Sequence, residues 1–190
     1  RYIQQGYLTI FREVSEQLEE MGEGLPDIVF IQAGVGAFAS AAAQFFSNPS
    51  DGVRLICVEP EAADCLFQSA KIGDGMPRSV SSGKGTIMAG LNCGTPSLTA
   101  WPTVRDRFDA FVSMEDHWAQ EAMRCLAAEG VVSGESGAAG LAALIALCKE
   151  NPDFLSEGLH LRNNARILVI NTEADTDPDA YRRIVDLPEG

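Results

Sequence analysis

The sequence predicts an α/β fold in which a mainly parallel sheet has helices on both faces. Four short runs of apolar and β-branched residues have the length of strands, and segments with helical spacing separate them. Polar and apolar residues do not alternate within these runs, so both faces of each strand are expected to be buried. Parallel strands need crossover connections, which the intervening helices provide.

The first half of the chain is predicted to contain two strands and three helices. Apolar residues recur at helical spacing from Tyr7 to Met21, which indicates an amphipathic helix. Pro60 is suited to the first turn of a helix. The expected elements are a helix over residues 6–21, a strand over 27–33, a helix over 37–46, a turn at 48–52, a strand over 53–59, and a helix opened by Pro60 that carries Ala63, Leu66 and Phe67.

The second half begins with a long glycine-rich connection, residues 73–94, whose weak periodicity indicates a functional loop. Two further apolar runs, DAFVSM and RILVIN, are expected to be strands. The expected elements are a helix over residues 97–107, a strand over 109–114, helices over 115–128 and 137–148, a strand over 166–171 and a helix over 178–185.

Composition excludes several classes of function. A formal net charge of −13 is unsuited to a nucleic-acid or anionic-membrane surface, which needs a basic patch. No apolar run approaches the roughly 20 residues of a membrane span. The five cysteines are scattered without a CxxC pair, so neither a disulfide scaffold nor a zinc site is expected. Free cysteines fit a reducing compartment, and we expect a cytoplasmic location.

The first strand end is chemically unusual because Gly34 and Gly36 stand where a strand meets a helix. Glycines let the backbone approach a ligand closely, and the free amides of the next helix bind anions, most often phosphate. The segment from Gly34 to Ala37 therefore predicts a phosphate site. Its spacing matches neither GxGxxG nor a P-loop, and a tight βα turn in which the glycines serve only packing explains it equally well.

Two other strand ends carry polar residues. Ser133 or Ser136 could cap the helix that follows, with Glu135 suited to its dipole. Asn171 and Thr172 could simply satisfy the backbone of a turn. The carboxyl ends of parallel strands meet at one edge of a sheet, where ligands bind. This convergence favours a functional site at that edge.

These segments resemble the fold-type II pyridoxal-phosphate enzymes, the tryptophan-synthase β-like family. The resemblance rests on QAGVGA at residues 32–37, VEP at 58–60, TIMAG at 86–90, ESGA at 135–138 and INT at 170–172, in the family's order. It implies pyridoxal 5′-phosphate as the cofactor, bound by Gly34, Val35, Gly36, Ala37 and Glu135. A hydroxyl or amide faces the ring nitrogen, for which Thr172 is preferred to Asn171.

Within this family the segments are similar to those of the diaminopropionate ammonia-lyases. Ala89 stands where the dehydratase branch has aspartate, and Ala89 and Gly90 are implied as part of the substrate pocket. The resemblance implies α,β-elimination of 2,3-diaminopropionate to pyruvate and ammonia by a homodimer. Another fold-type II enzyme, such as a serine or threonine dehydratase, and a non-catalytic phosphate-binding module remain as alternatives.

The family's Schiff-base lysine has no counterpart here, because Lys71, Lys84 and Lys149 all lack its sequence context. The resemblance places that lysine and the acid–base aspartates upstream of this chain. Residues 1–190 are therefore expected to be the carboxyl-terminal part of the enzyme's large domain, inactive when isolated. The residues available leave open whether the substrate is the D or the L isomer.

Overall fold

The protein is described by a computed structural model that covers residues 2–81, 83, 85–162 and 164–186. Its four strands are β1 (Ile28–Gln32), β2 (Arg54–Pro60), β3 (Ala110–Met114) and β4 (Ile167–Val169). They form one parallel sheet in the order β3-β2-β1-β4. The predicted α/β fold with a parallel sheet is confirmed.

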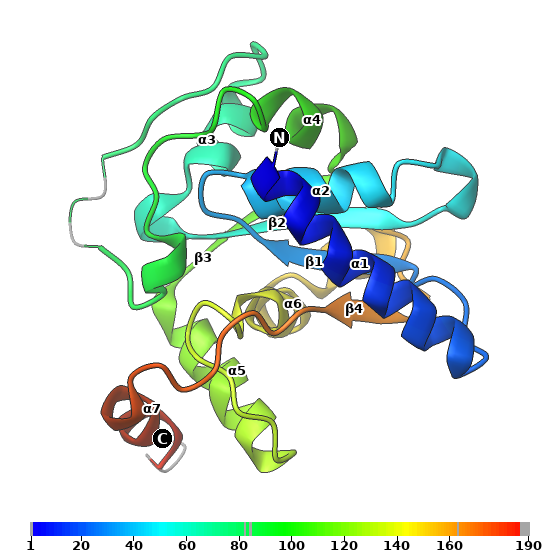
Figure 1. Ribbon diagram of the computed structural model, residues 1–190. Helices are drawn as coiled ribbons and strands as arrows, with labels where there is room; N and C mark the ends of the chain where they lie inside the picture. The colour runs from blue at the N-terminus through cyan, green and yellow to red at the C-terminus, as the bar shows by residue number, and fades with distance from the viewer. Residues whose placement is uncertain (1, 82, 84, 163, 187–190) are drawn as a thin grey trace.

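Helices cover both faces of this sheet (Figure 1). The helices are α1 (Tyr2–Glu20), α2 (Ala37–Phe45), α3 (Cys65–Ile72), α4 (Trp101–Arg107), α5 (Asp116–Ala128), α6 (Ala139–Glu150) and α7 (Pro178–Val185). Short helical turns occur at η1 (Pro49–Asp51), η2 (Glu61–Ala63), η3 (Ala89–Leu91) and η4 (Phe154–Gly158), of which η4 is a π-helix that the sequence did not predict.

The core has two halves because successive strand side chains point to opposite faces. Ile28 and Phe30 of β1 belong to a core cluster that includes residues of α5, α6 and α7, whereas Val29 and Ile31 belong to one that includes residues of α1, α2, α3 and α4. All four side chains are at most 2% exposed. Burial on both faces explains why β1 reads as a continuous apolar run instead of an alternating one.

Several predicted boundaries were wrong, for local reasons. Pro60 ends β2 and opens only the short turn η2, which carries Ala63; Leu66 and Phe67 belong to a separate helix, α3. The buried Glu59 carboxyl group accepts the amides of Leu66 (2.9 Å) and Phe67 (2.7 Å) in the first turn of α3. The predicted helix at residue 97 begins at Trp101, where Pro102 occupies the first turn. The predicted last strand ends early, at Val169.

Candidate functional site

A cavity of about 760 Å³ lies at the carboxyl edge of the sheet. The segments that follow β1 and β4 form much of its wall, joined by the loop before α4, the segment before α6 and two side chains of α1. Its lining comprises Tyr7, Ile10, Gln32, residues 34–38, Gly90, Leu91, Cys93, Ser136, residues 170–174 and Thr176. The carboxyl edge is where open α/β sheets bind ligands.

The glycine segment after β1 presents free backbone donors. Gly36 has a φ of +96°, in the left-handed region that favours glycine, and immediately precedes α2. The amides of residues 34–39 have no hydrogen-bond acceptor among the described residues, and the first amide bonded into the helix is that of Ser40, to the Gly36 carbonyl at 2.8 Å. Unpaired amides at the positive end of a helix form an anion site.

Gln32 and Thr172 meet in the cavity wall. The Gln32 Nε2 donates to the Thr172 hydroxyl and to the Ile170 carbonyl, each at 2.8 Å. Gln32 is only 3% exposed, and its Oε1 has no partner among the described residues. Because a side chain takes the Ile170 carbonyl, the strand ladder ends before this residue, which accounts for the shortened β4.

Asn171 has a different set of partners. Its Nδ2 donates to the Val132 carbonyl at 2.8 Å, and its Oδ1 accepts from the Ser133 hydroxyl at 2.9 Å and from the Glu173 amide at 3.2 Å. These bonds hold the turn after β4 to the segment before α6. Both atoms of the Asn171 amide are thus engaged in structural contacts, whereas Thr172 keeps a free hydroxyl proton.

The structure corrects the expectation that a serine caps the helix following Val132. Neither serine caps α6: its N-cap residue is Ala138, and the Ser133 hydroxyl instead binds Asn171. Glu173 takes the capping position from across the sheet edge: its Oε2 accepts from the amides of Ser136 (2.8 Å) and Gly137 (3.3 Å). A carboxylate at the start of a helix suits the helix dipole.

The loop that carries Ala89 and Gly90 is tied down at two points. The Ser136 hydroxyl accepts from the Gly90 amide at 3.0 Å. The Asp116 carboxylate, at the start of α5, accepts from the Ile87 amide at 3.0 Å and from the Thr86 hydroxyl. These bonds bring Gly90 to the cavity wall.

Seven of the nine predicted site residues line this one cavity: Gly34, Val35, Gly36, Ala37, Gly90, Asn171 and Thr172. Ala89 and Glu135 do not belong to its lining. Sequence reasoning missed Gln32, Cys93, Ser136 and Glu173 as wall residues, although Gln32 and Ser136 stand inside quoted motifs. Adjacency to a glycine segment or a strand end was the only signal available for them.

The groups with strongly perturbed pKa values lie outside the lining. Burial raises the pKa of Glu59 to about 8, against the opposing effect of the Leu66 and Phe67 amides. Burial, reinforced by Glu59, raises the pKa of Cys65 to about 12 and also raises that of Cys57. Glu59 belongs to the start of α3 and is not a wall residue of the cavity.

No lysine among the described residues lines the cavity. Lys71 is exposed in the last turn of α3, and Lys149 of α6 pairs with Glu121; Lys84 lies outside the described residues. The described residues also contain no cluster of His, Cys, Asp or Glu suited to a metal ion. All five cysteines are free, and no helix of the described chain has the length and apolar character needed to cross a membrane.

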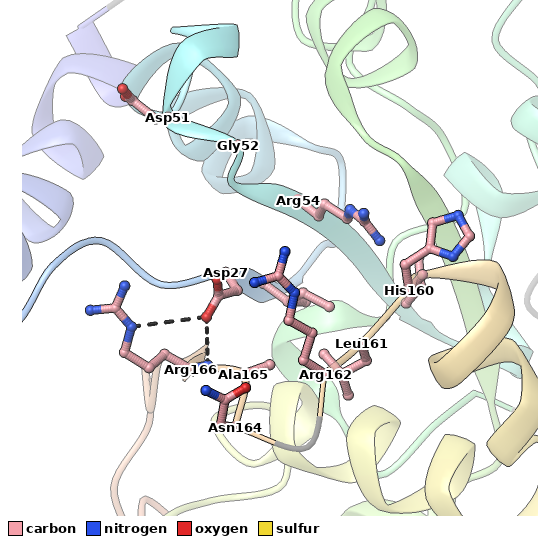
Figure 2. Close-up of a pocket in the computed structure, with 12 residues that line it drawn as sticks. Asp27, Asp51, Gly52, Arg54, His160, Leu161, Arg162, Asn164, Ala165 and Arg166 are labelled. Atoms are coloured by element: carbon pink, nitrogen blue, oxygen red, sulfur yellow. Dashed lines mark hydrogen bonds and ion pairs between the residues drawn. The ribbon is translucent and has the colours of Figure 1, made fainter.

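A second hollow, of about 500 Å³, lies at the opposite, amino edge of the sheet (Figure 2). Asp27 lies in its wall, accepting from the Arg166 amide at 2.7 Å, and Arg54, Arg162 and His160 are spread around the same space. None of the predicted site residues lines it. Since ligands of open α/β sheets bind at the carboxyl edge, the cavity beyond β1 and β4 is the candidate site.

Comparison with known proteins gives a consistent result. A family model described as pyridoxal-phosphate dependent enzyme matches residues 1–173. The chain is 41% identical to diaminopropionate ammonia-lyase of Salmonella typhimurium over 193 residues, which cover 97% of this chain and 48% of the relative. Its identity to serine racemase of Arabidopsis thaliana is 33% over 141 residues, 74% of this chain and 40% of the relative.

A solved structure is similar as well. Diaminopropionate ammonia-lyase from Escherichia coli, in complex with an aminoacrylate-PLP azomethine reaction intermediate, superposes with a TM-score of 0.84 and 39% identity, over 96% of this chain and 47% of that chain. The chain therefore spans about half, or less, of the length of the relatives it matches.

Proposed function

The chain belongs to the family of pyridoxal-phosphate dependent enzymes, and on that premise we propose that the cavity at the carboxyl edge of the sheet binds pyridoxal 5′-phosphate. The observation that carries this proposal is the convergence of the free amides of residues 34–39 and the Thr172 hydroxyl on one cavity. When bound, the cofactor supplies an electron sink for charge that develops on an amino-acid substrate.

The residues present fit the two ends of this cofactor. The free amides at the start of α2 donate to the phosphate, which the helix dipole also favours. Gly34 also lets the glycine segment pass close to the loop that carries Gly90 and Cys93. A Cβ on Gly34 would lie 3.1 Å from Cys93 Sγ and 3.4 Å from the Gly90 carbonyl oxygen. At the far wall, Thr172 offers a hydroxyl proton to a ring nitrogen.

For the whole protein we propose α,β-elimination of 2,3-diaminopropionate, with release of pyruvate and ammonia. The support is the 41% identity over nearly the whole chain to a diaminopropionate ammonia-lyase, against 33% over a shorter stretch to a serine racemase. Ala89, which stands where dehydratases have aspartate, agrees with this choice. A serine or threonine dehydratase-like activity is the alternative, supported by the serine racemase similarity.

The proposal assigns a limited share of the chemistry to these residues. They bind the phosphate, orient the ring and close one side of the substrate space next to Gly90. The described cavity wall lacks a lysine, so we propose that the group that holds the cofactor covalently comes from polypeptide beyond these 190 residues. The 190 residues themselves would form part of the enzyme's large domain. We further propose a cytoplasmic homodimer.

Release of a 2-oxo acid by the complete enzyme tests the reaction: pyruvate from diaminopropionate or serine, and 2-oxobutyrate from threonine. Pyridoxal phosphate is added, and D- and L-2,3-diaminopropionate, serine and threonine are compared at equal concentration. The proposal predicts faster release from at least one isomer of diaminopropionate than from serine, with no turnover of threonine. Faster turnover of serine or threonine would favour the dehydratase alternative, and cofactor binding without any turnover would favour a binding module.

A further inference from the structure

We propose that Gln32 is a positioning residue whose side-chain amide sets the direction in which the Thr172 hydroxyl donates its proton. The inference rests on the proposed function, because it concerns what Thr172 presents to the cofactor ring. Gln32 thereby joins the site, and its bond explains why the Thr172 hydroxyl donates to a ligand and does not accept from it.

The orientation of the Gln32 amide follows from its partners. Nε2 lies 2.8 Å from the Ile170 carbonyl oxygen and 2.8 Å from Thr172 Oγ1. A carbonyl oxygen can only accept, so the amide nitrogen and not Oε1 must face Ile170. Both protons of Nε2 are then used, one on each partner. The group facing Thr172 is therefore a donor.

This donor determines the role of the Thr172 hydroxyl. A hydroxyl has one proton to give, and here its oxygen accepts the Gln32 proton. The hydroxyl proton must point away from Gln32, and Thr172 has no other hydrogen bond among the described residues. Because Thr172 lines the cavity, that proton is available to a ligand. The site thus suits an acceptor, such as an unprotonated ring nitrogen, and disfavours a protonated one.

Packing alone does not explain a glutamine at this position. Gln32 is 3% exposed, and its Oε1 has no donor among the described residues. An unpaired buried acceptor is costly, and a methionine would fill similar space without it. We therefore attribute the glutamine at this position to its other polar atom, Nε2, which donates to Thr172.

A purely structural role for Gln32 must be separated from this one. The same two bonds join the end of β1 to the segment after β4, and their loss would lower stability whatever the cofactor does. The deciding readout is consequently the state of the ring nitrogen, which a structural clamp would not change. Gln44, an exposed residue of α2, provides the matched control.

The experiment uses the complete enzyme loaded with pyridoxal phosphate labelled with ¹⁵N in the ring. We expect the nitrogen chemical shift of an unprotonated, hydrogen-bonded ring in the wild type and in Gln44→Met. In Gln32→Met the Thr172 hydroxyl is free to rotate, so the shift should move and cofactor affinity should fall about two- to tenfold. Thr172→Ser, which keeps the hydroxyl, should retain the wild-type shift.

A second variant guards against poor folding of the first. In Gln32→Glu an ionised carboxylate accepts the Thr172 proton, so the shift should move further than in Gln32→Met. A wild-type shift in both Gln32 variants, even with lowered stability, would overturn the positioning role and leave only a clamp. Failure of the wild-type enzyme to bind the labelled cofactor would instead overturn the proposed function, and this inference with it.

Discussion

At the residue scale, the site depends on backbone that only glycine adopts easily. Gly36 turns the chain with a φ of +96° directly before the free amides of α2, and a Cβ there would already lie 3.5 Å from Ala100 Cβ. A β-branched side chain would add backbone strain, and its bulk would press on the buried side chains of Ala100 and Leu66 beside the anion site.

Gly36→Val should lower the affinity of the complete enzyme for pyridoxal phosphate by about tenfold or more, because bonds to a charged group are lost. It should also cost about 1–2 kcal/mol of stability through backbone strain. Gly22→Val is the control, since Gly22 has a φ of +72° but open space around it and no place in the cavity. Cofactor titration and urea denaturation measure the two effects, and equal affinities of the two variants would contradict the loop's role.

Only some of the site residues could be predicted from the sequence. Gly34 to Ala37 and Thr172 could be predicted to lie near a ligand because each follows a strand, a position that local pattern reveals. Gln32 and Glu173 could not, since their roles depend on bonds to residues far away in the chain, Thr172 and Ser136 respectively. A motif indicates which residues are near a ligand, but not which atoms face each other.

At the element scale, two helices have backbone amides at or just before their first turn that are bound by a glutamate side chain. For α3 this glutamate lies at the end of the preceding strand, and for α6 it follows β4, far away in the chain. Glu59 binds the first amides of α3, and Glu173 binds the amides before α6. Neither helix start could be predicted correctly from local caps. Helix α7 has the bounds that were predicted, and its start is set locally, by Asp177, whose side chain accepts from the Asp179 and Ala180 amides.

Glu59 should make stability depend on pH. Its pKa in the folded chain is about 8, above its ordinary value of 4.5, because burial disfavours the charged carboxylate. Between these pKa values the folded state keeps a proton that the unfolded state releases. This contribution to stability therefore falls as pH rises from 4.5 to 8, by at most about 1.4 kcal/mol per pH unit.

In Glu59→Gln that part of the pH dependence should disappear. The measurement is the free energy of unfolding of wild type and variant at several pH values across this window, with the exposed Glu129→Gln as control. If wild type and Glu59→Gln showed the same slope with pH, Glu59 would not be the titrating group.

Gly137 should be essential to the junction between α6 and the turn after β4. A Cβ there would lie 2.4 Å from Asn171 Oδ1 and 2.8 Å from the Glu173 amide, too close without movement of the turn. Gly137→Ala should cost about 1–3 kcal/mol and weaken cofactor binding, because Thr172 belongs to the displaced turn. Gly6→Ala in α1, where a Cβ meets nothing within 4 Å, should be neutral or stabilising, and thermal unfolding distinguishes the two.

At the scale of the whole molecule, topology is what assembles the site. In a parallel sheet, all strands present their carboxyl ends at one edge, so residues after β1 and after β4 come together although most of the chain separates them. The parallel order was predictable from unbroken apolar runs joined by helices. The interior of the cavity was not, because its wall is made by side chains whose directions follow from packing.

The 190-residue chain alone is predicted to be catalytically inactive, because no lysine of the described cavity wall can hold the cofactor covalently. The chain is mixed with pyridoxal phosphate, reduced with borohydride and mapped for labelled peptides. Substoichiometric, scattered labelling and no pyruvate from diaminopropionate are expected. A single stoichiometric adduct at Lys71 or Lys84, with pyruvate release, would contradict this prediction.

The central claim is that one cavity holds both ends of pyridoxal phosphate, and a crystal structure of the complete enzyme with its cofactor tests it most directly. The account predicts the phosphate on the amides of residues 34–37 and the ring nitrogen opposite the Thr172 hydroxyl. A phosphate bound elsewhere, or a ring nitrogen facing a carboxylate such as Glu173, would contradict it.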